Sequence, residues 1–280
     1  MQVFLNGAFV AVDEARVSVF DRGFLLGHGA FETMRAYRGR VFRPAQHLER
    51  LHRTCAALGI PFVPDVARLE PVVETLLDRN GLADARLRLT VTAGPEEEYL
   101  PCHPTILLAA FPLPTGTAAP GWRAYLWQGA VSSHDPLRTH KTTSYLEKVL
   151  ARREAKSKGF DEALFVNEKE NVTEGSATNI FCIRAGTILT PPTVEGLLPG
   201  VTRAVVAELA TRTGIPFLER PLAPEDIVRS DEAFLTNSVV EIVPLVAVGR
   251  TPVGNGAPGP LTARLQAAYR ELVRQELGVG

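Results

Sequence analysis

The chain has 280 residues, of which 45% are hydrophobic and 22% are charged, a balance typical of a soluble globular protein. Basic and acidic residues nearly cancel to a formal net charge of -1, which excludes the concentrated positive charge that a nucleic-acid-binding protein needs. No apolar run approaches the roughly 20 residues that span a bilayer, which argues against a membrane protein. We therefore expect a small-molecule ligand and, from the length, two domains.

The cysteines and the N-terminal residues bear on the cellular compartment. Cys55, Cys102 and Cys182 are odd in number and widely spaced, which fits neither a disulfide framework nor a metal site. The first residues reach Asp13 and Glu14 without the apolar segment of a signal peptide. We expect a reducing, cytoplasmic location and no bound metal.

The first half of the chain shows strand patterns, then helical ones, then strands again. Asn6-Gly7 between two apolar runs is a strong hairpin signal. Arg38-Gly39-Arg40 separates a second pair of strand-like runs. In chain order, the spacing of apolar residues predicts strands at 3–5, 8–12, 31–37 and 41–42, helices at 48–58 and 69–77, and strands at 86–92 and 105–111.

The segment 114–122, rich in Pro, Gly, Thr and Ala, is the predicted linker between two domains. A helix is expected to begin near Ser144, because Ser144 and Glu147 match a capping box. The other elements expected in this half are strands at 123–127, 163–166 and 180–183, and helices at 201–214 and 261–277. The chain is therefore predicted to be α+β, with a small α/β N-terminal domain at 1–113 and a larger C-terminal domain at 123–280.

Lys141 is the first candidate for chemistry. It lies just before the helix predicted near Ser144, with Arg138 and His140 close in sequence. A lysine becomes a nucleophile when burial or a neighbouring cation destabilises its ammonium form. Most lysines between two elements are simply solvated, so this position alone is a weak signal.

Glu174 is the second candidate, because it lies among the small polar residues 173–178, directly before a predicted strand. Small residues let a flat ligand approach the backbone closely. A carboxylate at hydrogen-bond distance would keep a pyridine-type ring nitrogen protonated. A surface turn with a solvated glutamate is the alternative.

Several separate residues could bind a phosphate. The helix predicted after Pro199-Gly200 offers the free N–H groups of Val201 and Thr202 and the Thr202 hydroxyl. Ser238 follows another strand-like run, and Arg50 could use its forked donors. Ordinary helix starts and solvated arginines are much more common than phosphate sites, so each signal is weak by itself.

Six segments in order closely resemble the class IV aminotransferase family of fold type IV enzymes, which depend on pyridoxal 5′-phosphate (PLP). That family contains branched-chain aminotransferases, D-amino-acid aminotransferases and 4-amino-4-deoxychorismate lyases. The resemblance covers residues 3 to 248, nearly the whole chain. The segments are DRGFLLGHGAFETMR (21–35), HLERL (47–51), HKTTSYLEKVLARREAKSKGFDEALFVN (140–167), TEGSATNIF (173–181), LLPGVTR (197–203) and FLTNSVVEIVPL (234–245).

The resemblance implies a role for each candidate. Lys141 would form an aldimine with PLP and move the proton between the substrate Cα and the cofactor C4′, while Glu174 would pair with the pyridine nitrogen. The phosphate would be held by Arg50, Val201, Thr202 and Ser238, and Tyr145 would contact the phenolic oxygen. The resemblance further implies a homodimer, with the cofactor between the small and large domains.

The reaction is predicted to be a transamination between an amino acid and a 2-oxo acid, with L- or D-preference left open. Thr33 and the Thr-Asn-Ser sequence at 236–238 look more like the lyase branch, which eliminates pyruvate from aminodeoxychorismate. The acidic stretch at 93–98, however, offers no arginine for that dicarboxylate. A non-catalytic PLP-binding protein is a remote alternative. Candidate substrate-binding residues are Thr33, Arg35, Arg88 and Arg138.

Overall fold

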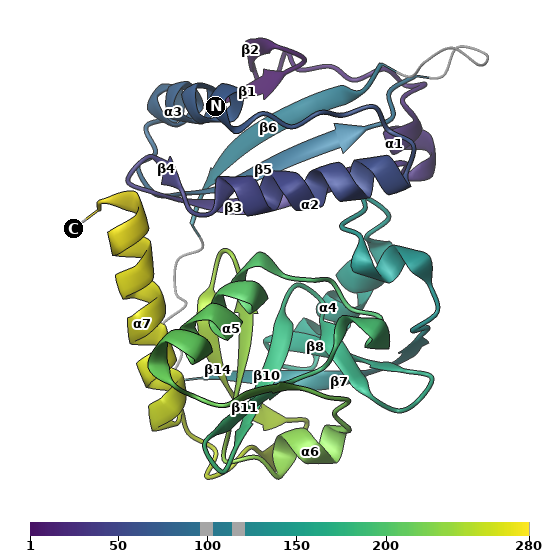
Figure 1. Cartoon of the computed structure of the whole chain (residues 1–280). Coiled ribbons are helices and arrows are strands. Elements are labelled where there is room, and N and C mark those ends of the chain that lie inside the picture. Colours follow the sequence, from purple (N-terminus) through teal and green to yellow (C-terminus); the bar gives the residue numbers. More distant parts are fainter. Residues whose placement is uncertain (96–102, 114–120, 280) are drawn as a thin grey trace. The chain divides into compact units, whose positions relative to one another are not determined.

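The computed structural model describes residues 1–95, 103–113 and 121–279 (Figure 1). The chain divides into two compact units. The first comprises Met1–Thr115, His140–Ser144 and Val273–Gly280, and the second comprises Gly116–Thr139 and Tyr145–Leu272. Lys141 therefore counts with the first unit, although the predicted C-terminal domain included it. Most of the predicted linker at 114–122 lies outside the described residues, and the predicted domain boundaries stay a prediction.

The first unit is built on a six-stranded antiparallel sheet with the strand order β2-β1-β6-β5-β3-β4. Buried leucines of α2 and α3 pack on one face of this sheet, against Met34 and Leu87. The elements are β1 (Gln2–Leu5), β2 (Ala8–Ala11), α1 (Arg22–Leu26), β3 (Gly29–Tyr37), β4 (Arg40–Val41), α2 (Pro44–Ala57), α3 (Val66–Asn80), β5 (Ala85–Thr92) and β6 (Thr105–Pro112).

Local sequence explains much of this unit. Asn6 and Gly7 both adopt positive φ, 49° and 92°, as the tight turn between β1 and β2 requires, so the predicted hairpin is confirmed. Along β5, buried residues alternate strictly with half-buried ones, which confirms the predicted half-exposed strand. Leu87 therefore faces the core, and Arg86 and Arg88 face the other side of the sheet.

The second unit holds a nine-stranded mixed sheet with the path β12-β11-β10-β13-β14-β7-β8-β9, and β15 pairs with β14. Its strands are β7 (Trp122–Val131), β8 (Glu162–Asn167), β9 (Val172–Gly175), β10 (Asn179–Arg184), β11 (Thr187–Thr190), β12 (Phe217–Glu219), β13 (Glu232–Asn237), β14 (Glu241–Val248) and β15 (Thr251–Pro252). Its helices are α4 (Leu146–Ser157), α5 (Val201–Thr213), α6 (Pro224–Val228) and α7 (Pro260–Leu277), whose last residues count with the first unit. The predicted α+β class is confirmed, and none of the helices described here is long and apolar enough to cross a membrane.

The predicted capping box at the start of α4 is wrong. Tyr145 occupies the N-cap position, and no side-chain hydrogen bond caps the helix. The Ser144 hydroxyl instead donates to the carbonyl oxygen of Gly27, at 3.2 Å. Glu147 pairs with Arg138, at 2.6 Å. Ser144 and Glu147 therefore bind residues outside α4 instead of capping the start of the helix.

Candidate active site

Lys141 lies in a segment that is attached to strand β3. The amide of Phe31 donates to the carbonyl oxygen of Lys141 at 2.9 Å, and the amide of Thr143 donates to that of Gly29 at 2.8 Å. These bonds hold the lysine backbone in place. The side chain is half-buried, and its Nζ lies 4.6 Å from the centroid of the Phe31 ring. The Lys141 backbone is thus fixed, and the side chain is partly removed from solvent, which is one of the conditions that favour a nucleophilic lysine.

Arg88 reaches the same phenyl ring as Lys141. Its guanidinium carbon lies 3.8 Å from the Phe31 centroid, and Arg88 pairs with Thr33 in the β3–β5 register. Of the predicted residues, Arg88 and Lys141 therefore lie at one phenyl ring, and Thr33 lies opposite Arg88 in the strand pair. Arg35 lies over the ring of Tyr37, at 4.4 Å. Arg138 belongs to the second unit, where it pairs with Asp135 and Glu147.

Arg50, a predicted phosphate ligand, forms a buried ion pair that sequence reasoning missed. Its Nε and Nη2 donate to the two carboxylate oxygens of Glu32, each at 2.7 Å, and Nδ1 of His47 lies 2.7 Å from the same carboxylate. Burial alone would raise the pKa of Glu32, but Arg50 and His47 outweigh it and hold that pKa at about 2. Burial lowers the pKa of His47, so its neutral ring donates through Nδ1. The orientation of Arg50 is thus fixed by two bonds.

A signal for Glu32 was present in the sequence. Positions 30, 34 and 36 of β3 carry Ala30, Met34 and Ala36, which face the core, and alternation places Glu32 on the same face. A carboxylate on a core face requires partners, because an unpaired buried charge is very costly.

In the second unit, Glu174 on β9 is a buried carboxylate with a partner at each oxygen. Nζ of Lys148, on α4, lies 2.6 Å from Oε1, and the amide of Leu198 donates to Oε2 at 3.1 Å. Glu174 is 4% exposed. Burial would lower the pKa of Lys148, but Glu174 outweighs it and raises that pKa, so the ammonium stays charged. Lys148 is not among the predicted site residues.

Tyr145 and Glu162 stabilise the turn that follows Glu174. The Tyr145 hydroxyl donates to the carbonyl oxygen of Ser176 at 2.7 Å, and burial raises the pKa of the phenol. Glu162, fully buried on β8, accepts hydrogen bonds from the amide of Ser176, at 3.1 Å, and the hydroxyl of Thr178, also at 3.1 Å. Glu162 thus fixes the small-residue turn and was also missed from the sequence.

The predicted phosphate donors of the second unit start at α5. Gly200 is the N-cap, without a side-chain hydrogen bond, and Val201 and Thr202 follow it as the first buried residues. A Cβ on Gly200 would lie 2.0 Å from the side-chain oxygen of Asn179, so a larger residue there would require the Asn179 side chain to move. Gly200 itself adds no side chain at the start of α5, where the backbone donors of Val201 and Thr202 begin.

Strand β13 adds further polar groups next to Asn179. Thr236, which pairs with Asn179 in the β10–β13 register, has a buried hydroxyl oxygen without a hydrogen-bond partner among the described residues. Ser238 lies in the turn after β13, which Asn237 stabilises by accepting from the amides of Val239 and Val240 at 2.8 and 2.9 Å. An orphaned hydroxyl beside a helix N-terminus fits a phosphate group.

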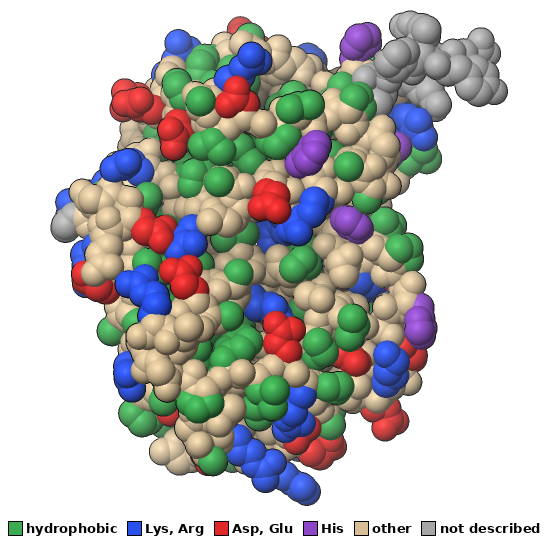
Figure 2. All heavy atoms as spheres, viewed as in Figure 1, with side chains coloured by type: hydrophobic (Ala, Val, Ile, Leu, Met, Phe, Trp, Pro, Cys, Tyr) green, Lys and Arg blue, Asp and Glu red, His purple; other side chains and the backbone are tan. Residues whose placement is uncertain are grey.

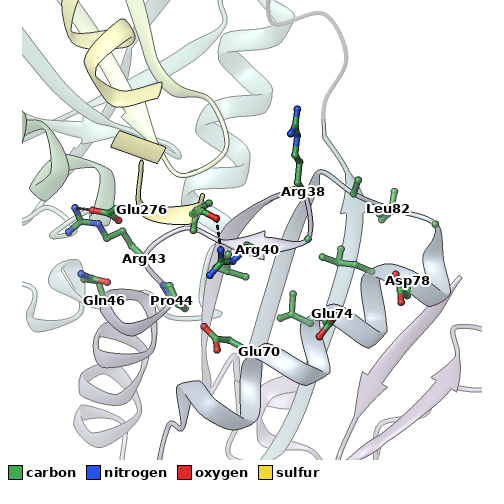
Figure 3. Close-up of a pocket in the computed structure, with 17 residues that line it drawn as sticks. Arg38, Arg40, Arg43, Pro44, Gln46, Glu70, Glu74, Asp78, Leu82 and Glu276 are labelled. Carbon is green, nitrogen blue, oxygen red and sulfur yellow. Dashed lines mark hydrogen bonds and ion pairs between the residues drawn. The ribbon is translucent and has the colours of Figure 1, made fainter. Parts of the chain in front are cut away.

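A separate pocket of about 1020 Å³ in the first unit holds none of the predicted residues. Figure 3 shows arginines on one side of it and the carboxylates of α3 on the other, with Arg43 directed at Glu276 and Arg40 at the end of α7. The distances are 2.5 Å from Arg43 Nη2 to Glu276 Oε1 and 2.5 Å from Arg40 Nη1 to the Leu277 carbonyl oxygen. These contacts attach the last turn of α7 to the first unit.

Comparisons with known proteins agree on one family. The family model for amino-transferase class IV matches residues 29–248. A protein of Methanocaldococcus jannaschii, provisionally named a branched-chain-amino-acid aminotransferase, is 36% identical and covers 100% of this chain and 98% of its own length. D-alanine aminotransferase of Bacillus licheniformis is 29% identical, with 99% and 98% covered.

Solved structures give the same result. The branched-chain amino acid aminotransferase of Escherichia coli superposes with a TM-score of 0.89 at 27% identity, over 97% of this chain and 93% of that one. A protein of Legionella pneumophila, provisionally described as a 4-amino-4-deoxychorismate lyase, has a TM-score of 0.85 at 26% identity, over 92% and 95%.

Proposed function

Because the chain belongs to the class IV aminotransferase family, we propose that it binds PLP through Lys141 and exchanges an amino group between an amino acid and a 2-oxo acid. The chain is an enzyme of the PLP-dependent aminotransferase type. The observation that carries the assignment to Lys141 is its attachment to β3, which holds the half-buried amine beside Phe31 and Arg88.

The residues present suit PLP. When bound, PLP supplies an electron-withdrawing ring that stabilises negative charge at the substrate Cα. Lys141 Nζ would bind the cofactor covalently and carry the proton between the substrate Cα and the cofactor C4′. The Glu174 carboxylate would accept a hydrogen bond from the ring nitrogen and keep it protonated, and the Tyr145 hydroxyl would contact the phenolic oxygen.

The phosphate group would be held by donors from several elements. The α5 amides of Val201 and Thr202 would contribute the helix N-terminus, and Ser238 would contribute a hydroxyl. Arg50 would add a cation whose orientation is fixed by Glu32. The unpartnered Thr236 hydroxyl supports this assignment, because a bound anion or its water would satisfy it.

We propose that Arg88 binds the substrate carboxylate, because a guanidinium matches a carboxylate and this one lies at the same ring as Lys141. The similarity to branched-chain and D-alanine aminotransferases supports small or branched apolar amino acids as substrates. A lyase reaction is the second candidate. It is supported by the position of Thr33 opposite Arg88 and by the similarity to the Legionella structure.

We propose that the chain forms a homodimer, because large apolar side chains are grouped on its surface. Figure 2 shows apolar side chains exposed on one face of the molecule. The α1 patch comprises Val17, Val19, Phe20, Phe24, Leu25 and Leu26, whose exposed fractions are 48–73%. The α4 patch comprises Leu146, Val149 and Leu150, spaced as on one face of a helix and 50–69% exposed. Large apolar side chains grouped in this way mark interaction surfaces.

The free, buried Cys55 and Cys182 support a reducing, cytoplasmic location.

The test starts from the purified protein supplied with PLP. Borohydride reduction followed by peptide mass analysis is expected to place the cofactor on Lys141, and Lys141→Arg is expected to abolish this attachment. Loss of a catalytic base should lower the rate of amino transfer by about 10²–10⁴-fold or more. Lys156→Arg, on the exposed part of α4, is the matched control. Attachment that persists in Lys141→Arg would contradict the assignment.

The reaction type is tested with a panel of L- and D-amino acids. Single half-reactions, followed through the change in cofactor absorbance, are expected to proceed with apolar amino acids and to stop until a 2-oxo acid is added. Release of pyruvate from aminodeoxychorismate without any amino acceptor would instead establish the lyase reaction. In that case Thr33→Ala is expected to lose the activity and Thr33→Ser to retain part of it.

A further inference from the structure

Lys148 forms a buried ion pair with Glu174 in the second unit. The proposed chemistry gives Glu174 a role but gives none to Lys148. Lys148 lies in the first turn of α4, and its Nζ is 2.6 Å from Oε1 of Glu174. The side chains of Lys148 and Glu174 are only 16% and 6% exposed. The amide of Leu198 donates to the other carboxylate oxygen. Glu174 is therefore held at both oxygens by this chain's own residues.

A buried carboxylate cannot stay ionised without such partners. Transfer of an isolated carboxylate out of water is so costly that the group takes up a proton instead. A protonated Glu174 would have no negative charge to offer a ring nitrogen. The surroundings of Lys148 also include the Tyr145 ring, whose centroid is 5.4 Å from Nζ, and Arg138, a like charge that opposes the ammonium. Glu174 is the carboxylate with which Lys148 pairs directly.

We propose that Lys148 is a positioning residue that keeps Glu174 ionised and in one orientation while no ring nitrogen is there to pair with it. The functional meaning rests on the proposed function, in which Glu174 receives the protonated ring nitrogen of PLP. The Glu174 carboxylate then already carries its negative charge, and its side chain already has the required conformation, before the cofactor binds. The ion pair itself is a property of the chain and is tested without cofactor.

The experiment uses the full-length protein after removal of any bound cofactor. Infrared spectra at neutral pH are recorded for wild type, Lys148→Met, Lys148→Arg, Glu174→Gln and Lys148→Met/Glu174→Gln. We expect the C=O band of a protonated carboxylic acid in Lys148→Met alone. Its disappearance in the double variant would assign that band to Glu174. Lys148→Arg retains the charge and is expected to resemble wild type. A Lys148→Met spectrum without the band would refute the proposal.

Urea unfolding of the same proteins provides the second measurement. Lys148→Met is expected to lower the folding equilibrium constant at least 10-fold in the wild-type background and much less in the Glu174→Gln background. Equal losses in the two backgrounds would contradict the pairing. If Lys148→Met does not fold, recovery of folded protein in the double variant supports the pairing, and failure to recover it argues against it.

These outcomes are separable from those of the proposed function. Borohydride labelling of Lys141 in the wild type reports whether PLP binds there, whatever the state of Glu174. Labelling without the infrared result would leave PLP binding intact and remove only the role of Lys148. The infrared result without labelling would confirm the ion pair and overturn the proposed function.

Discussion

Glu32 is fully buried and has two basic partners, so its removal is expected to destabilise the fold. Glu32→Gln is expected to lower the free energy of unfolding by about 3–5 kcal/mol at neutral pH, because it leaves Arg50 buried without its counter-charge. The measurement is urea unfolding. Glu49→Gln, on the exposed side of α2, the helix that carries Arg50, also removes a carboxylate and is expected to change stability by less than about 0.5 kcal/mol. Equal effects of the two changes would refute the buried-pair explanation.

The pH dependence of stability follows from the same cluster. The pKa of Glu32 is about 2 in the folded protein, below its ordinary value of 4.5, so its contribution is complete above pH 4.5 and is lost as the pH falls toward 2. The pKa of His47 is lowered from 6.5, so the unfolded chain binds a proton first and stability falls as the pH drops below 6.5. Unfolding measured from pH 7.5 downward should show both steps, and His47→Gln should flatten the first. A stability that is constant from pH 7 to 5 would contradict this prediction for His47.

Residue types, together with the order of the motifs, predicted part of the candidate site. Lys141, Glu174 and Thr202 could be selected because their chemistry suits a phosphate-bearing ring and because their order resembles one family. Lys148 and Glu162 could not be selected, because a lysine in a helix and a glutamate in a strand are usually solvated, and their partners are distant in sequence. Lys148 meets Glu174 across 26 residues, and Glu162 meets Ser176 across 14. Only the tertiary structure brings these pairs together.

At the scale of elements, the N-terminus of α7 depends on a carboxylate from another strand. Glu232 on β13 accepts hydrogen bonds from the amides of Leu261 and Thr262, at 2.9 and 2.8 Å, and from the Thr262 hydroxyl, at 2.7 Å. Glu232→Ala is expected to lower the free energy of unfolding by about 1–3 kcal/mol, because buried donors lose their acceptor. Glu225→Ala, in the exposed first turn of α6, is the control and should have little effect. Thermal unfolding would measure the difference.

Gly259 provides an independent check of that cap. A Cβ at this position would lie 2.0 Å from the side-chain Cδ of Glu232, so Gly259→Ala is expected to destabilise the wild type. Shortening Glu232 to alanine removes the clash. The double variant should therefore be more stable than the sum of the two single effects predicts. Additive effects would show that the carboxylate does not occupy this position.

Elements were predictable where the determinants are local. The Asn6-Gly7 hairpin and the helices α2, α3, α5 and α7 follow from turn residues and apolar spacing within a few positions. The capping box at Ser144 failed because Ser144 bonds Gly27, which lies 117 residues away in the chain. The strand order of the larger sheet could not be predicted either. Strand β14 pairs with β7 across more than a hundred residues, and the spacing of apolar residues carries no information on such pairing.

At the scale of the whole molecule, the α+β fold was predictable but the membership of each unit was not. The segment around Lys141 follows the predicted linker in sequence, yet its backbone bonds attach it to β3 of the first unit. The last residues of α7 also count with that unit, through the contacts of Arg40 and Arg43. Composition can predict a linker, but it cannot show that a later segment of the chain returns to an earlier sheet.

The two apolar patches give the prediction for assembly. None of the five residues of α1 is buried, although three of them are Phe24, Leu25 and Leu26. The fold of the chain thus leaves three large apolar side chains of one short helix exposed, and such a group is typical of an interaction surface. A second copy of the chain would supply a matching apolar surface, as in the symmetric dimers that most soluble oligomers form.

If the chain forms the proposed homodimer, Phe24→Asp, in the α1 patch, and Leu150→Asp, in the α4 patch, are expected to convert it to a monomer. A lost interface anchor of about 2 kcal/mol raises the dissociation constant by about 30-fold or more, because each 1.4 kcal/mol is a factor of ten. Sedimentation equilibrium over a range of protein concentrations measures this change. Val194→Asp is the matched control, because Val194 is 73% exposed but belongs to neither patch. A wild type that sediments as a monomer would overturn the dimer, and dissociation by Val194→Asp alone would move the interface to another face.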